Sequence, residues 1–345
     1  MRRHIKIWTG IAVILTMMTA SVYSQKNQKL AQTGFQFLSV VSDARGSAMA
    51  EALTSLETGS SALFFNPAGM ANMTGLVDMT ASTNQWIADI RHTTFSLALS
   101  PKGGEWGVLG FSLQSVNYGE FFGTRVDKGT DLGYVDTGIF ELTAFAAGVG
   151  YAKRLTDRFS VGGQVRYVHQ DLGESVIPRY GTVTDSLGTR PDTTEQRVTS
   201  RLNPLAFDFG TQFKTGFKSL VFGMSVRNFS KEIKYVEEGF QLPLVFNLGI
   251  SMDVFDFWED SPEDHSLVVS VDASHHRDHP EEIKVGMDYR LLDMLSLRCG
   301  YITSNDESGF SFGLGVSSYG VAFDYAYTPF GVFDKVQRMT ARIRL

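Results

Sequence analysis

The stretch LAFDFGTQFK, residues 205–214, alternates between large apolar side chains and small or polar ones. From Leu205 to Phe213 every second residue is leucine, phenylalanine or threonine, whereas the residues between them include Asp208 and Gln212. A period of two is the pattern of a β-strand with one apolar face. The same alternation recurs at residues 244–254, 283–291, 310–317 and 321–327. These repeats predict an all-β chain.

Counting such segments from residue 76 to residue 345 gives about fourteen strands. Each is close to the ~10 residues that cross a bilayer as a tilted strand. The connections alternate between tight turns and longer polar segments, and short turns opposite long loops are typical of outer-membrane barrels. The long connections are placed at residues 119–137, 171–201 and 230–241. The connection at residues 256–265 is long where this pattern predicts a short turn.

A soluble β-sandwich also alternates apolar and polar residues, so the period alone leaves two fold classes open. Nearly every strand here has one strongly apolar face, and closure into a barrel removes the exposed edges of so many strands. Small residues and charges of both signs, such as Arg166 and Asp208, occupy the other face and suit a narrow polar lumen. Trp86 and Tyr118 lie near strand ends, where interfacial aromatic girdles form. We therefore predict a transmembrane antiparallel β-barrel of about fourteen strands over residues 76–345, surrounded by outer-membrane lipid.

Residues 1–24 have the features of a cleaved export signal. A basic start precedes an apolar run over residues 7–18, and Val22 and Ser24 suit cleavage after residue 24. The apolar run is shorter than the ~20 residues of a spanning helix, which argues against an uncleaved anchor. Removing its three Lys and Arg residues leaves 28 basic against 37 acidic residues. Such an acidic chain argues against nucleic acid as a partner, and the single Cys299 excludes a disulfide framework.

Residues 25–75 differ from the rest and are predicted to form a short helical plug. Asn66 is a good helix cap and Pro67 suits the first helical position, so residues 60–71 predict a sharp turn into a short helix. A compact segment ahead of a barrel is most simply placed inside it, and a periplasmic extension packed beneath the barrel is the alternative. Ser42 or Asp43 can cap an earlier helix. Its apolar stripe is Ala48, Met49, Ala52, Leu53 and Leu56.

Three short motifs in this N-terminal segment carry a family likeness. They are FQFL at residues 35–38, DARG at residues 43–46 and SALFFNPAG at residues 61–69. Together they resemble the PorV/PorQ family, which belongs to the FadL-like group of fourteen-stranded outer-membrane barrels. The Asn-Pro-Ala element is the most specific piece, because FadL-like proteins also carry it near their N-terminal plug. The resemblance assigns a structural plug motif to Asp43, Arg45, Gly46, Asn66, Pro67, Ala68 and Gly69.

The resemblance implies two functions, and the sequence leaves both open. PorV-like members imply a type IX secretion component that binds the signal domain of secreted proteins and passes them to other subunits of the secretion and surface-attachment machinery. FadL-like members imply passive uptake of hydrophobic molecules. We predict the first function and keep the second as the alternative. Apolar residues within the long polar connections are the expected partner-facing positions. They are Phe121, Phe122, Val176 and Ile177.

The sequence lacks familiar motifs for catalysis. It contains no HExxH or Walker loop, so we predict no enzyme activity, no catalytic residue and no cofactor. His275, His276 and His279 with Asp278 could hold a divalent ion, but a solvated extracellular turn explains the same residues. We predict no metal site there.

Overall fold

The computed structural model describes residues 33–127, 129–185, 188–235, 238–258, 264–303, 309–331 and 335–345, with residues 175–196 described by their backbone alone. The signal peptide predicted over residues 1–24 lies outside this part of the chain. Among the described residues, no helix is long and apolar enough to cross a membrane.

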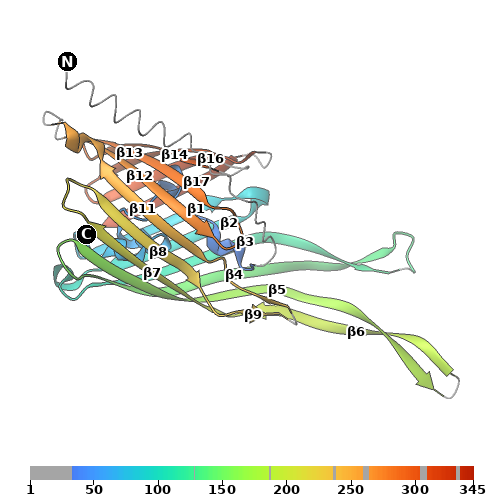
Figure 1. Cartoon of the computed structure of the whole chain (residues 1–345). Helices are drawn as coiled ribbons and strands as arrows, with labels where there is room; N and C mark the ends of the chain where they lie inside the picture. Colours follow the sequence, from blue (N-terminus) through green and yellow to red (C-terminus); the bar gives the residue numbers. More distant parts are fainter. Residues whose placement is uncertain are drawn as a thin grey trace.

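The described strands form one closed antiparallel barrel, as Figure 1 shows. The first wall strand, β1, pairs with the last, β17, and the pairing of β4 with β5 closes the sheet. The segments β6 and β7 follow one another through Asn203 and Pro204, and both pair with β5. Counted as one wall strand, they give the barrel fourteen strands. The predicted fold class is thereby confirmed.

The wall strands are mostly eight to twelve residues long, and four of them extend much further when β6 and β7 are counted as one. Their bounds are β1 (Val77–Gln85), β2 (Arg91–Leu99), β3 (Val108–Val126), β4 (Tyr134–Arg154), β5 (Phe159–Asp185), β6 (Gly188–Leu202), β7 (Leu205–Lys214), β8 (Val221–Phe229), β11 (Val245–Asp253), β12 (His265–His276), β13 (Glu282–Leu291), β14 (Leu295–Ile302), β15 (Phe310–Ser318), β16 (Val321–Pro329) and β17 (Lys335–Arg344). The remaining short elements of the connections are β9 (Ile233–Lys234), β10 (Gly239–Phe240), η4 (Ile87–Asp89), η5 (Pro101–Gly104) and η6 (Val254–Phe257).

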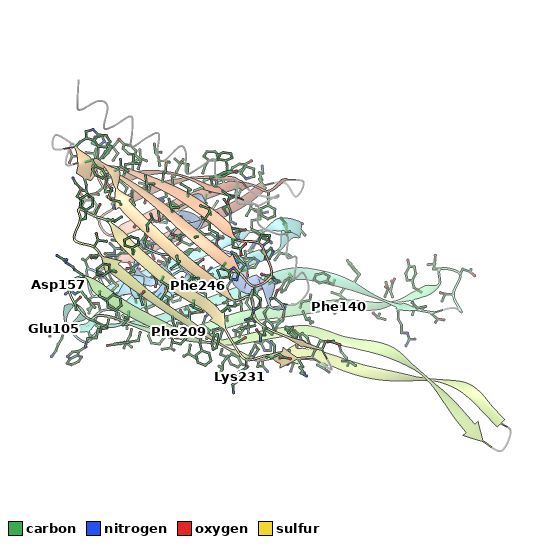
Figure 2. The ribbon with its side chains drawn as sticks, viewed as in Figure 1. Glu105, Phe140, Asp157, Phe209, Lys231 and Phe246 are labelled. Atoms are coloured by element: carbon green, nitrogen blue, oxygen red, sulfur yellow. The ribbon has the colours of Figure 1, made fainter. Side chains whose placement is uncertain are left out.

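Side chains alternate between the outside of the barrel and its interior. In β7, Phe209 has 54% of its surface exposed on the outside, whereas its neighbour Asp208 is buried in the lumen. Figure 2 shows Phe209 on the outer surface of the wall, among many other outward side chains. An apolar exterior around a polar interior is the arrangement of a barrel in lipid, because the bilayer core cannot solvate polar groups. The protein is therefore an outer-membrane barrel.

Two long hairpins rise from one end of the barrel, on the right in Figure 1. Residues 119–137 and 171–201, predicted to be loops, instead continue β3–β4 and β5–β6 as paired strands. The pairing register shifts beside Gly119 and Gly173, both of which have positive φ, where each hairpin departs from the wall. Backbone pairing continues beyond the bilayer because each arm satisfies the other's hydrogen bonds. Long connections mark this end as extracellular.

The N-terminal segment runs through the barrel interior. Thr33 forms a bridge with Gln241 near the extracellular end, and Leu76 donates to the carbonyl of Leu345 at the opposite, periplasmic end. The short helix predicted after Ser42 or Asp43 ends at Ala48, before most of its predicted apolar stripe, because Ala50 and Glu51 adopt positive φ. The apolar stripe is nevertheless buried at Ala48, Met49, Ala52 and Leu53. The elements of the segment are η1 (Gln36–Ser39), α2 (Ala44–Ala48), η2 (Gly59–Phe64) and η3 (Pro67–Met70).

Candidate functional site

Asp43, Arg45 and Gly46 fasten the first part of the internal segment. The Asp43 carboxylate accepts a hydrogen bond of 2.7 Å from the backbone nitrogen of Gly46 and caps α2. The Arg45 guanidinium lies 3.1 Å from a carboxylate oxygen of Asp288 on β13. Gly46 is tightly enclosed, since a Cβ there would overlap the ring of Phe65. The DARG motif thus combines a helix cap at Asp43, an ion pair with the wall at Arg45 and close packing of Gly46 against the Phe65 ring.

Asn66 holds the second motif in place through three hydrogen bonds. Its side-chain oxygen accepts from the backbone nitrogen of Ala68 at 3.1 Å and caps η3, in which Pro67 is the first residue. Its amide nitrogen donates to the carbonyl of Thr54 at 2.6 Å and to that of Thr211 at 3.0 Å. The Asn66 side chain is buried, so all three bonds are shielded from water. Because Thr211 belongs to β7, the cap also joins the internal segment to the wall.

The wall provides room for this motif at glycine positions. A Cβ added to Gly162 on β5 would lie 2.5 Å from the backbone nitrogen of Ala68. A Cβ on Gly210 of β7 would overlap the Asn66 amide. Gly69 itself sits against the carbonyl of Leu56, 2.9 Å from an added Cβ. The predicted plug motif is therefore in backbone contact with the barrel interior, as expected of a structural role.

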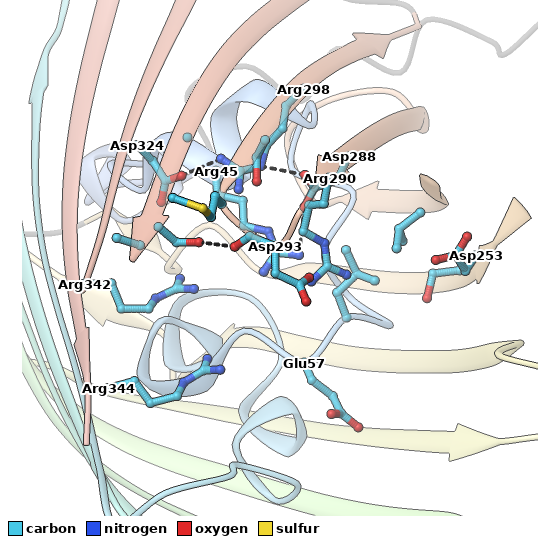
Figure 3. Close-up of a pocket in the computed structure, with 18 of the residues that line it drawn as sticks. Arg45, Glu57, Asp253, Asp288, Arg290, Asp293, Arg298, Asp324, Arg342 and Arg344 are labelled. Carbon is cyan, nitrogen blue, oxygen red and sulfur yellow. Dashed lines mark hydrogen bonds and ion pairs between the residues drawn. The ribbon is translucent and has the colours of Figure 1, made fainter. Parts of the chain in front are cut away.

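Charged wall residues bind the same segment toward the periplasmic end. Arg298 donates to Asp288 at 3.0 Å and to Asp324 at 2.5 Å, so Asp288 joins Arg45 of the internal segment to two wall strands, as Figure 3 shows. Nearer the extracellular turn between β12 and β13, Lys284 lies 2.9 Å from Glu51. Buried ion pairs of this kind are strongly destabilising when one partner is removed. They therefore fix the segment in one position.

The extracellular rim holds the start of the segment through Asp278, in the turn between β12 and β13. Thr33 and Gln36 donate to the Asp278 carboxylate at 2.7 and 2.8 Å, and His279 lies 2.8 Å from it. Burial disfavours ionisation of this carboxyl, but the three hydrogen bonds outweigh it and hold its pKa well below the usual range. His275 and His276 instead face Glu281 and Glu282. Among the described residues, no cluster of His, Cys, Asp and Glu side chains could hold a metal ion.

A cavity of about 1100 Å³ opens at the extracellular end. Its aromatic walls come from the internal segment, the barrel and the β9–β10 hairpin. Phe240 stacks between Phe35 and Tyr235, with ring centroids 6.2 and 5.3 Å apart, respectively. Burial raises the pKa of the Tyr235 hydroxyl to about 12, so this group stays neutral. The apolar residues lining this cavity, which we call the extracellular cup, are Phe35, Phe37, Val40, Trp86, Ile90, Tyr118, Leu172, Tyr235 and Phe240.

Sequence reasoning assigned Trp86 and Tyr118 to an interfacial girdle, and the structure corrects both. Trp86 packs its ring against Phe330, with centroids 4.8 Å apart, and lines the cup. Tyr118 packs against the apolar cluster inside the barrel. The strand alternation could have predicted that both side chains point into the lumen. Trp86 lies an even number of residues from the lumen-facing Asp78, and Tyr118 lies an even number from the lumen-facing Ser112. Phe240 offered no such signal, since it belongs to a connection.

A second cavity of about 1030 Å³ opens at the periplasmic end, among the tight turns. We call it the periplasmic vestibule. Its charged lining residues are Arg45, Glu57, Lys214, Lys218, Asp253, Asp288, Arg290, Asp293, Arg298, Asp324, Arg342 and Arg344. Figure 3 shows the arginines on several strands directed toward a common space. Charged residues thus form a larger part of the lining of the vestibule than of the extracellular cup, where the charged lining residues are Glu232, Glu238 and Arg277.

The internal segment separates these two cavities. Between them, the described residues enclose a gap of only about 20 Å³, lined by Val41, Phe65 and Arg227 among others. Above the gap, Phe35, Phe37 and Leu38 pack against an apolar patch of wall. The patch consists of Val116, Ala144, Ala146, Val168 and Ala206.

The predicted partner-facing residues lie on the long hairpins rather than in loops. Phe122 is 78% exposed, and Phe121 stacks on Phe140 across β3 and β4, with centroids 5.6 Å apart. The backbone of Val176 and Ile177 belongs to β5 and pairs with β6. Their side chains lie outside the described part of the chain. Neither Phe121 nor Phe122 lines a cavity described above.

Comparison with known proteins places this geometry in a structural group. No family model matches the sequence, and neither does any curated protein. The Ralstonia pickettii toluene transporter TbuX superposes with a TM-score of 0.56 at 12% identity, covering 88% of this chain and 98% of that one. The Pseudomonas putida toluene transporter TodX gives 0.55 at 13%, covering 87% and 95%, and a FadL homologue from Pseudomonas aeruginosa gives 0.55 at 13%, covering 88% and 98%. Such low identity shows the fold alone.

These structural neighbours agree with the predicted FadL-like fold. No match supports the narrower PorV/PorQ assignment or its type IX secretion role. The wall pairing, the apolar exterior and these neighbours agree on the architecture and the location. The protein is a fourteen-stranded antiparallel β-barrel with a FadL-like fold, located in the outer membrane.

Proposed function

We propose that this barrel is a conduit for hydrophobic small molecules, which it first binds in the extracellular cup. The observation that carries the proposal is the aromatic lining of that cavity, at the end of the barrel that faces the cell exterior. Its volume of about 1100 Å³ is at the upper end of the usual range for small-molecule sites. The transport function that the sequence kept as the alternative is therefore favoured over protein shuttling.

The floor of the cup is suited to an apolar solute that moves inward. Phe35 and Phe37 of the internal segment separate the cup from the apolar wall patch beneath it. Contacts between apolar groups are non-directional, so a hydrophobic solute can replace them with little loss of free energy. The domain division proposed from the sequence, a plug over residues 25–75 ahead of the barrel, gives this segment the role of a gate. The gate must shift for passage, because the gap below it is far smaller than a solute.

Binding of the neutral fluorophore N-phenyl-1-naphthylamine to the purified barrel in micelles tests the proposal. The double variant Trp86→Ala, Phe240→Ala should bind at least about thirtyfold more weakly, because each removed ring contributes apolar contact of the order of 1–3 kcal/mol. Phe209→Ala is the matched control, since its ring is 54% exposed to lipid and distant from the cup. Uptake of the same probe into whole cells should fall in parallel. Equal binding by all three proteins would contradict the proposal.

A second function, capture of a secreted protein, is supported by a different observation. The β3–β4 hairpin projects past the barrel and exposes apolar side chains, including 78% of Phe122. Exposed apolar residues away from lipid are typical of partner surfaces. Replacing Phe121 and Phe122 with serine and deleting residues 176–197 should leave assembly intact, as judged by heat-modifiable migration. Loss of surface display of a secreted protein, with unchanged probe uptake, would favour this second function.

A further inference from the structure

Arg342 is a buried cation that has no carboxylate in contact with it. It lies on the inner face of β17, 9% exposed, on the wall of the periplasmic vestibule. Its Nε donates to the hydroxyl of Thr80 at 3.4 Å, and a terminal nitrogen donates to the hydroxyl of Ser61 at 3.2 Å. Among the described residues, no acidic side chain forms an ion pair with it. Both contacts are neutral, so no carboxylate is bound directly to this positive charge.

Other buried cations of the lumen are compensated. Arg298 has Asp288 and Asp324, Arg166 lies 2.7 Å from Asp208, and Lys284 lies 2.9 Å from Glu51. Such pairing is the normal condition of a buried charge, because removal from water disfavours an isolated ion strongly. Arg342 therefore differs from these three cations, each of which has a carboxylate in contact with it.

Two further buried arginines lack a carboxylate but differ from Arg342 in their surroundings. Arg338 donates to the carbonyl of Val41 at 2.9 Å and faces the ring of Trp86, and Arg227 donates to the carbonyl of Phe64. Neither lines the vestibule, and the gap beside Arg227 has only about 20 Å³. Of these three arginines, Arg342 alone adjoins a cavity large enough for a ligand.

One candidate for a counter-charge, Asp43, interacts with Arg342 electrostatically without being in contact with it. Its carboxylate caps α2 through the nitrogen of Gly46, and burial raises its pKa, an effect that the charge of Arg342 opposes. Arg344, two residues along the same inner face, donates to Asp78 at 3.2 Å and keeps 42% of its side chain exposed. Figure 3 shows Arg342 and Arg344 directed into the vestibule from one strand. Its charged lining counts seven basic and five acidic residues, within a chain of net charge −6.

We propose that the vestibule binds a small soluble oxyanion, a phosphate or a short-chain carboxylate, between Arg342 and Arg344. The planar guanidinium fork matches the oxygens of both groups and forms charge-assisted bonds with them. The anion supplies the negative charge that Arg342 lacks, and the open vestibule gives it access from the periplasm. A free anion is favoured over a lipid headgroup, because both arginines point into the lumen and away from the bilayer.

Line broadening of inorganic phosphate in ³¹P spectra, recorded with the purified barrel in non-ionic detergent, tests the site at equilibrium and without any transport step. Broadening should saturate, be reversed by succinate and persist in sodium chloride of equal ionic strength. Arg342→Gln and Arg344→Gln should each weaken binding about tenfold or more, as loss of a charge-assisted bond requires. Arg290→Gln is the matched control. It removes an equal charge from the same vestibule, where Arg290 donates to Ser266 at 3.4 Å and interacts electrostatically with Asp288.

Heat-modifiable migration confirms that each variant is folded. If Arg342→Gln does not fold, Arg342→Lys replaces it, and binding should still weaken because the ammonium lacks the fork. If Arg290→Gln and Arg342→Gln weaken phosphate binding equally, the proposal is overturned, because the anion is then attracted by the overall positive charge of the vestibule and not by a specific site. Non-saturating broadening, or binding of dodecyl phosphate micelles without binding of free phosphate, would overturn it as well.

Discussion

Replacing Asn66 with alanine should loosen the plug while the barrel stays intact. The side chain is buried and makes three hydrogen bonds, one within η3 and two to the carbonyls of Thr54 and Thr211. Alanine can make none of them, and the truncation also leaves two buried carbonyls short of a donor. The change acts on the only contact of this side chain with the wall among the hydrogen bonds described, at Thr211 on β7.

The expected magnitude follows from those bonds. Loss of a helix cap costs about 1 kcal/mol, and each further buried hydrogen bond contributes about 1 kcal/mol. The three together give about 3 kcal/mol, which multiplies the population of locally opened plug by about 150. The barrel itself should be unaffected, because its wall pairs strand by strand without Asn66.

Hydrogen exchange followed by mass spectrometry measures the effect on peptides covering residues 54–73, with wall peptides as an internal reference. Asn72→Ala is the matched control, because its amide nitrogen bonds the exposed carboxylate of Glu57 at 2.9 Å. An exposed hydrogen bond of this kind should cost only a few tenths of a kcal/mol. Limited proteolysis of residues 33–75 gives an independent reading.

The reasoning is refuted if Asn66→Ala exchanges at the wild-type rate and its plug keeps native protease resistance. It is also refuted if Asn72→Ala has the larger effect. Faster exchange of plug and wall peptides together would show global destabilisation. That result would also contradict the reasoning, because the three lost hydrogen bonds should loosen the plug alone.

Three further changes have expected outcomes. Asp288→Asn should destabilise the barrel by about 3 kcal/mol, because it leaves the largely buried Arg45 without a carboxylate; the midpoint of urea unfolding in micelles measures this, and an unchanged midpoint contradicts it. Gly162→Ala should push η3 off the wall, so plug proteolysis should rise while heat-modifiable migration persists. The hydrogen bonds of Asp278 should survive from pH 7 to pH 5. The pKa of Asp278 is lower in the folded protein than the value of about 4 in the unfolded chain. Its contribution to stability is therefore complete above about pH 4 and is lost only as the pH falls through the lower folded pKa. Faster hydrogen exchange at Thr33 by pH 5 would contradict this assignment.

The wall could be predicted from the sequence because lipid imposes a strict alternation on it. Outward residues such as Phe209 must be apolar, and inward residues such as Asp208 must suit a polar lumen. A one-residue slip would place Asp208 in lipid, so the pattern is enforced on every strand. The number of strands follows from counting these repeats. Beyond the bilayer the constraint ends, which is why the paired arms at residues 119–137 and 171–201 resembled loops.

The plug motif was recognisable, but its contacts were not. Asn66 and Pro67 form a local capping signal that sequence alone reveals. The partner of that cap on the wall, Thr211, is 145 residues away, and no local pattern specifies the pairing. The two cavities are equally non-local, since Phe35, Trp86 and Phe240 meet only after the barrel closes. The PorV/PorQ assignment rested on the motif alone and stays a prediction.

The lumen resists displacement of the plug by different means at its two ends. On the extracellular side, Phe35 and Phe37 touch an apolar wall, and an apolar solute can replace those contacts. On the periplasmic side, Arg45 forms an ion pair with Asp288, and separating them would leave a buried charge without a partner. A hydrophobic solute in the cup can therefore shift η1 at much lower free energy than α2. The directional bonds fix where the segment stays, and the non-directional contacts determine where it can yield, so under the proposed transport function entry should begin at η1 while the ion-paired half stays in place.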